Sequence, residues 1–203
     1  TLVDKSTINI YDEHSKLLWT ENVSQNKSRD FAILKDFSRI AVTCGNQINI
    51  YRILKTPVKL ELDCTVSLNA PPISLTISEK THQLIAACGN GSITIFKEPA
   101  SSGVSLQFQC NSVRIVSASP TSDFFAIISK KSRLMIVDMT TGKPYSLLET
   151  THEGEASLLQ WSINGNWLCV ASSQKPNIST FCMKYIHHIH LIFVLLFILL
   201  EIL

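Results

Sequence analysis

Three histidines near the C-terminus, His187, His188 and His190, form the densest group of metal-ligand side chains in the sequence. In an extended segment His188 and His190 share a face, and in a helix His187 and His190 do. Either way two imidazoles could meet one ion, but no third ligand is fixed by the spacing. The sequence therefore predicts no metal site and no cofactor.

The residues that could perform catalysis are scattered. No serine, cysteine or threonine lies in a strained turn of the G-x-S-x-G kind. Gly89-Asn90-Gly91-Ser92 is typical of a hairpin turn, because no helix follows it to complete a phosphate site. The sequence therefore predicts a protein that is not an enzyme, with its carboxylates on a solvated surface. They include Asp123, Asp138, Glu149, Glu153 and Glu155.

The charge pattern gives little support for direct RNA binding. The 203 residues include 18 Lys+Arg and 16 Asp+Glu, for a net charge of +2. One short basic cluster, Lys130-Lys131-Ser132-Arg133, lies between two apolar runs. Because phosphate binding depends on clustered cations, the sequence favours a solvated loop there over a phosphate site.

The six cysteines show no zinc-ligand spacing. Cys44, Cys88 and Cys169 lie inside apolar runs, where a thiol behaves as a small buried hydrophobe. We therefore expect reduced cysteines in an intracellular protein; an extracellular disulfide set is the alternative. The three tryptophans, Trp19, Trp161 and Trp167, are expected in the core or between packed sheets.

A repeat organises the chain as far as residue 181. Five similar segments have their third positions at 10, 50, 95, 136 and 180, so that the spacings are 40, 45, 41 and 44 residues. This period matches four-stranded propeller blades. The segments are Ile8-Asn9-Ile10-Tyr11, Ile48-Asn49-Ile50-Tyr51, Ile93-Thr94-Ile95-Phe96, Leu134-Met135-Ile136-Val137 and Ile178-Ser179-Thr180-Phe181.

Each of the middle three segments follows another apolar run across a polar turn. The pairs read RIAVTC-GNQ-INIYRI, QLIAAC-GNG-SITIF and FFAIIS-KKSR-LMIVDM. This is the pattern of antiparallel hairpins, and Gly45-Asn46 and Gly89-Asn90-Gly91 supply residues that tolerate positive φ. An apolar run precedes each hairpin and a weaker alternating run follows it. We therefore expect four strands per repeat, with four full repeats and a partial one at the start.

The repeats resemble those of the WD-repeat β-propeller family, in which the third strand ends in Trp-Asp. An aromatic or aliphatic residue is kept here at Tyr11, Tyr51, Phe96, Val137 and Phe181, and the acid at Asp12 and Asp138. The family's Gly-His opening looks similar to Thr151-His152. The resemblance implies that eight residues hold structural positions of the blades: Tyr11, Asp12, Tyr51, Phe96, Val137, Asp138, His152 and Phe181.

The resemblance implies an all-β fold of four to five four-stranded antiparallel blades. The family usually closes its ring with seven or eight blades, so residues 1–183 are expected to form part of a ring. Since a blade buries its faces only against neighbouring blades, we expect further blades or a partner to complete it.

The last twenty residues, 184–203, differ from the repeats. They include ten uninterrupted apolar residues, from Leu191 to Leu200. This length is marginal for a bilayer span, which needs about 20 apolar residues. Two interpretations remain open: a C-terminal membrane anchor within residues 185–203, or an alternative terminus produced by splicing or read-through.

The resemblance implies a non-enzymatic scaffold that binds other proteins within a multiprotein complex. Short matches such as Gly165-Asn166-Trp167-Leu168 also resemble cirhin-type propellers of the small-subunit ribosome-assembly machinery. That resemblance implies a nucleolar protein that meets RNA only indirectly. We therefore expect a cytoplasmic or nuclear location, with a tail-anchored membrane protein carrying a cytosolic propeller as the alternative.

Overall fold

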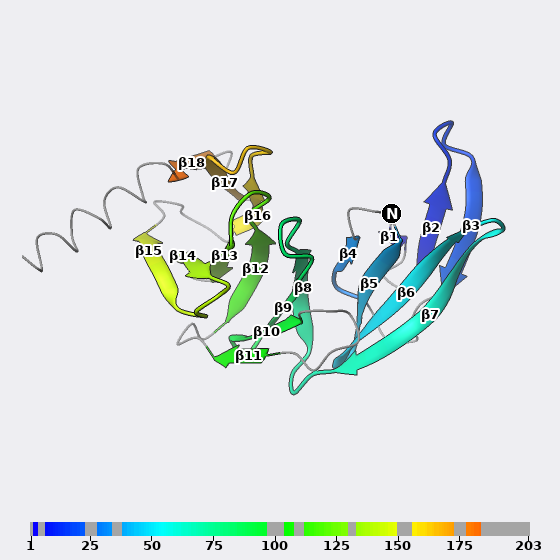
Figure 1. Cartoon of the computed structure of the whole chain (residues 1–203), viewed down its shortest axis with the longest axis horizontal. Helices are drawn as coiled ribbons and strands as arrows, with labels where there is room; N and C mark the ends of the chain where they lie inside the picture. Colours follow the sequence, from blue (N-terminus) through cyan, green and yellow to red (C-terminus); the bar gives the residue numbers. More distant parts are fainter. Residues whose placement is uncertain are drawn as a thin grey trace, which may run out of the picture.

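The computed structural model describes residues 2–3, 7–22, 28–33, 38–96, 104–107, 112–129, 133–149, 156–172 and 178–183. Within these residues the chain forms five antiparallel sheets, which we call blades 1 to 5. Figure 1 shows the blades following one another in chain order, from blue to orange. Consecutive strands pair within each blade, as the alternating apolar pattern predicted.

The blades have the following strands. Blade 1 contains β1 (Leu2–Val3), β2 (Thr7–Tyr11) and β3 (Leu17–Asn22). Blade 2 contains β4 (Phe31–Ile33), β5 (Arg39–Cys44), β6 (Gln47–Lys55) and β7 (Val58–Ser67). Blade 3 contains β8 (Pro72–Ile77), β9 (Leu84–Cys88), β10 (Ser92–Phe96) and β11 (Val104–Gln107). Blade 4 contains β12 (Val113–Ala118), β13 (Phe124–Ser129), β14 (Arg133–Asp138) and β15 (Pro144–Glu149). Blade 5 contains β16 (Ala156–Trp161), β17 (Trp167–Ser172) and β18 (Ile178–Cys182).

The predicted repeat is confirmed strand by strand. All five third positions fall in equivalent strands, namely β2, β6, β10, β14 and β18. The first two strands of blades 3, 4 and 5 also share a register shift, which follows Pro72, Val113 and Ala156 respectively. Blade 5 differs from the expected four strands per repeat, since it has three strands within the described residues. Residues 184–203 lie outside the described residues.

The core is divided into four apolar clusters, one at each boundary between blades. Side chains alternate along a strand, so each strand sends one set of residues to the preceding blade and the other set to the next. At the boundary of blades 3 and 4, for example, Ile93 and Ile95 of β10 meet Phe125 and Ile127 of β13. The other three boundaries are built in the same way. Blade-to-blade packing therefore stabilises the arc.

The predicted hairpin turns and two of the three tryptophans are placed as expected. Gly45 and Gly91 have φ values of 59° and 89°, in the region that favours glycine. Trp161 is buried between blades 4 and 5, and Trp19 packs against the cluster between blades 1 and 2. The expectation for Trp167 is wrong: its side chain is 48% exposed, because it points to the side of blade 5 on which no described blade packs.

Gly165, in the turn between β16 and β17, is a position where alanine is expected to destabilise the fold. Its φ is +67°, and a Cβ there would collide with the Thr121 hydroxyl of blade 4. We expect Gly165→Ala to lower the free energy of unfolding by about 1–3 kcal/mol in urea titrations. Gly89→Ala is the matched control, since its Cβ would lie 3.8 Å from Ile73 Cγ2 in ordinary contact. Equal losses in the two variants would contradict this account.

Candidate functional site

The WD-like positions of the middle blades are buried against the blade that precedes them. Tyr51, Phe96 and Val137 are 8%, 2% and 0% exposed. Tyr51 belongs to the cluster shared with blade 1, Phe96 to the one shared with blade 2, and Val137 to the one shared with blade 3. Phe181 packs in the same way against the cluster between blades 4 and 5. These side chains join one blade to the next.

Tyr11 occupies the same position in blade 1 but is 45% exposed. No described blade lies on the side of blade 1 that this position faces. Its hydroxyl accepts a hydrogen bond from Asn9 Nδ2 at 3.3 Å, just as the Tyr51 hydroxyl accepts one from Asn49 at 3.4 Å. The identical sequence therefore gives the same local geometry, and the neighbouring blade alone decides the burial.

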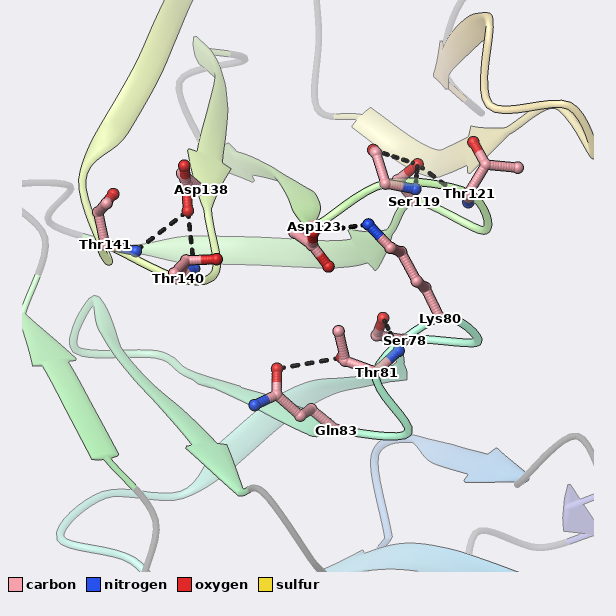
Figure 2. Close-up of polar contacts among 11 residues, drawn as sticks. Ser78, Lys80, Thr81, Gln83, Ser119, Thr121, Asp123, Asp138, Thr140 and Thr141 are labelled. Atoms are coloured by element: carbon pink, nitrogen blue, oxygen red, sulfur yellow. Dashed lines mark hydrogen bonds and ion pairs between the residues drawn. The ribbon is translucent and has the colours of Figure 1, made fainter.

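The acids of the WD-like dipeptides bind backbone amides in the turns that follow them. The Asp138 carboxylate accepts hydrogen bonds from the amides of Thr140 and Thr141, at 2.7 Å and 3.0 Å (Figure 2). The Asp12 carboxylate accepts two in the same way, from His14 and Lys16. Both acids therefore stabilise tight turns, and their assignment to WD-like structural positions stays a prediction. His152 lies outside the described residues.

Serine side chains hold the turns between the first two strands of blades 3, 4 and 5. Ser78 accepts from the amide of Thr81, Ser119 accepts from those of Thr121 and Ser122, and Ser162 accepts from that of Trp167. Two contacts link these turns across the blade boundaries. Lys80 Nζ lies 2.6 Å from the Asp123 carboxylate (Figure 2). The Thr121 hydroxyl donates to Asn164 O at 3.5 Å. The three turns therefore form a continuous row, and Asp123 serves in it as an inter-blade ion pair.

Asp30, just before β4, connects three blades. Its carboxylate accepts a hydrogen bond from the amide of Leu75 in blade 3, at 2.7 Å, and one from the amide of Phe31. The Ser74 hydroxyl also hydrogen-bonds this carboxylate and accepts from the amide of Val116 in blade 4, at 3.2 Å. No pattern in the sequence predicts this network, because it joins residues about 40 positions apart.

Thr43 of β5 fixes the backbone that carries Asp30. Its hydroxyl accepts hydrogen bonds from the amides of Arg29 and Asp30, at 2.8 Å and 3.0 Å, and lies 3.1 Å from Asp30 O. The side chain is 1% exposed. The Asp30 carboxylate is therefore oriented from within its own blade.

Burial raises the pKa of the Asp30 carboxyl above its ordinary value of 3.8, and its hydrogen bonds oppose that shift only in part. The folded state therefore binds the proton more tightly than the unfolded state does. This contribution to stability is complete below pH 3.8 and is lost as the pH rises through the folded pKa.

We therefore expect the stability of the wild type relative to Asp30→Asn to fall as the pH rises from about 4. The slope should not exceed about 1.4 kcal/mol per pH unit, the limit for one proton. Urea titrations of both proteins across the acidic range measure this difference. A difference that is constant or rises with pH would refute the assignment.

An apolar groove of about 450 Å³ lies between blades 1 and 2. Two of its rim residues, Leu18 and Ile33, are both 42% exposed. Its deeper walls are formed by residues of the cluster between these blades, among them Ile8 and Ile40. No pattern in the sequence predicts this groove, because its walls come from two separate repeats.

A second cavity of about 270 Å³ lies between β4 and β8, the innermost strands of blades 2 and 3. Among the described residues that line it, Glu79 is the one with a titratable side chain. In the part of the chain described, no three His, Cys, Asp or Glu side chains gather as metal ligands. His187, His188 and His190 lie outside that part, as do Lys130 and Lys131.

The described cysteines Cys44, Cys64, Cys88, Cys169 and Cys182 are free thiols. Cys88 is buried, its thiol donates to Ala70 O at 3.3 Å, and burial raises its pKa. Cys44 and Cys169 are only partly buried. No helix of the described residues is both long and apolar enough to cross a bilayer.

A family model described as the anaphase-promoting complex subunit 4 WD40 domain matches residues 116–191. No curated protein sequence matches the chain. Among solved structures, the chain is similar to the β-propeller domain of Cps50 (Swd1) from Myceliophteria thermophila, with a TM-score of 0.74 and 16% identity. The match covers 88% of this chain and 59% of that one, so the chain spans less than two thirds of the solved propeller. The cirhin-type resemblance stays a prediction. The blade geometry and these two matches show that the chain has the fold of a WD-repeat β-propeller.

Proposed function

We propose that the chain is a non-enzymatic scaffold that binds other proteins within a multiprotein complex. The observation that carries this proposal is the apolar groove between blades 1 and 2, whose rim exposes Leu18 and Ile33. Apolar side chains gathered around a concave surface are typical of interaction sites. A WD-repeat fold is consistent with such a role, although the fold alone does not determine function.

The continuous row of turns between the first two strands of blades 3, 4 and 5, which we call the turn row, supports the same proposal. The side chains of Ser78 and Ser119 accept hydrogen bonds from backbone amides of these turns, and Lys80 is paired with Asp123. These contacts rigidify a row of short turns on the blades. Binding by a rigid surface loses less conformational entropy than binding by a mobile one.

The name of the family model supports membership of a complex, because it refers to a subunit of one. A ribosome-assembly complex, in which the chain would meet RNA only through its partners, is the more specific proposal from the sequence. An intracellular location, cytoplasmic or nuclear, belongs to the same proposal. Imaging and carbonate extraction of the tagged full chain test it: membrane retention that disappears when residues 184–203 are deleted would favour the anchor instead.

The test of the scaffold proposal is a binding experiment with purified partners. The full chain is immobilised, retained proteins are identified by mass spectrometry, and each is then titrated against the chain in purified form. We expect at least one defined stoichiometric complex. If no purified candidate binds the folded chain, the proposal fails.

A further inference from the structure

We propose that the groove between blades 1 and 2 binds a short, acidic linear segment of a partner protein, with one bulky apolar side chain in the groove and a carboxylate on Lys55. This inference rests on the proposed scaffold function and names the chemistry of the partner. The groove holds about 450 Å³, within the usual range of binding pockets.

A hairpin that extends beyond its own sheet creates the groove. The pairing of β5 with β6 ends at Arg39 and Arg52, but β6 and β7 continue to pair as far as Lys55 and Val58. This extension is visible as the long pair of strands in Figure 1. Ile53, Leu54, Lys55, Val58 and Leu60 therefore line one wall without a covering strand of β5. Blade 1 supplies the opposite wall.

The inside of the groove suits an apolar side chain. Ile8, Ile10, Phe31, Ile40 and Leu60 belong to or pack against one apolar cluster, and all five line the groove. Burying a side chain the size of Leu or Phe against them would contribute about 1.5–3 kcal/mol. An aromatic or large aliphatic residue is therefore the anchor that the groove favours.

The charge at the edge of the groove determines which type of residue should lie next to the apolar anchor in the bound segment. Among the described residues that line the groove, Lys55 is the one that carries a charge, and it is exposed. The other cations of this hairpin are already paired: Lys59 with Glu61 at 2.6 Å, and Arg52 with Asp63 at 2.8 Å. No ion pair of Lys55 occurs within the described residues. A carboxylate next to the anchor would therefore meet one available cation, and no acid lies among the described lining residues to repel it.

The shape favours a protein segment over a lipid surface. Peripheral binding to a bilayer needs a broad apolar face with several cations. The groove is concave, lies between two blades and carries one cation. A single anchor with an adjacent acid matches that arrangement better.

The probe is the fluorescein-labelled peptide GSFLDESG, titrated against the full chain by fluorescence anisotropy. In the first control peptide Ser-Ser replaces the apolar pair Phe-Leu, and in the second Lys-Lys replaces the acidic pair Asp-Glu. We expect saturable binding of the first peptide and at least about tenfold weaker binding of both controls. No binding of the first peptide, or equal binding of all three, overturns the proposal.

Two protein variants with matched controls locate the site. Ile33→Trp fills the groove without changing charge, and Ile178→Trp adds the same bulk to an exposed isoleucine of blade 5. Lys55→Glu reverses the cation, and Lys143→Glu does so at an exposed lysine in the turn between β14 and β15. We expect about tenfold weaker binding for the groove variants and little change for the controls. Circular dichroism confirms that each variant is folded.

The outcomes separate this inference from the scaffold proposal. If a purified partner binds the groove variants as well as it binds the wild type, the groove assignment is overturned and the scaffold proposal stands. If neither the peptide nor any purified partner binds, both fail. A third outcome is that the full chain cosediments with vesicles of phosphatidylcholine and phosphatidylserine. If Ile33→Trp abolishes that cosedimentation, the groove is assigned to membranes and the peptide proposal is overturned.

Discussion

Phe125→Ala is expected to lower the free energy of unfolding by about 3–5 kcal/mol, the usual cost of truncating a buried phenylalanine. Phe125 is 0% exposed and lies in β13, at the boundary of blades 3 and 4. Its ring packs in one cluster with residues of both blades, including Ile85 and Val137. The cavity left by alanine would loosen two blades at once. Urea unfolding followed by circular dichroism measures the loss.

Phe124→Ala is the matched control for this prediction. Phe124 is the same residue type one position earlier in β13, but it points to the other side of the sheet, where it is only partly buried. Its ring centroid lies 5.0 Å from that of Tyr145. We expect a loss of less than half that of Phe125→Ala. Equal losses would contradict the conclusion that the boundary clusters stabilise the arc.

Asp30→Ala is expected to cost about 2–4 kcal/mol at neutral pH. The substitution leaves the amides of Leu75 and Phe31 and the Ser74 hydroxyl without their acceptor, and each unpaired buried donor costs about 1–3 kcal/mol. Removing a charge whose pKa is raised by burial offsets part of that loss. The net effect is therefore smaller than the sum of the lost hydrogen bonds.

Asp123→Ala is the comparison, because this acid also bonds across a blade boundary. Its partner is Lys80, and both side chains are more than a third exposed, so the expected loss is about 1 kcal/mol or less. Guanidinium titrations of the two variants at pH 7 distinguish the two kinds of contact. A larger loss for Asp123→Ala would show that the turn row, and not the Asp30 network, holds the blades together.

Much of the blade pattern was predictable because it depends on neighbours in the sequence. Alternating apolar residues determine which face of a strand is buried, and glycines at positive φ mark the hairpins. The segments at Ile50, Ile95 and Ile136 therefore fell in the predicted strands, within the predicted sheets. Even the spacing of 45 residues after Ile50 has a structural counterpart, since blade 2 contains the extended hairpin of β6 and β7.

The candidate site was not predictable in the same way. The Asp30 network needs Leu75 and Val116 to be brought alongside, and the groove needs walls from two blades and a hairpin that extends past its sheet. No local pattern encodes such contacts, because they depend on how one repeat packs on another. The exposure of Trp167 was mispredicted for the same reason.

Tyr11 and Tyr51 illustrate the division between sequence and tertiary structure. Both residues end an Ile-Asn-Ile-Tyr segment that was predicted to be a strand. Both accept a hydrogen bond from the asparagine two residues earlier. Tyr51 is 8% exposed because blade 1 packs over it, whereas Tyr11 is 45% exposed because no described blade packs over it. The sequence alone determined the strands, their pairing and their periodicity, since these depend on side-chain alternation over a few residues. Only the tertiary structure decided which of these faces are covered and where a binding surface remains, because burial depends on the neighbouring blade.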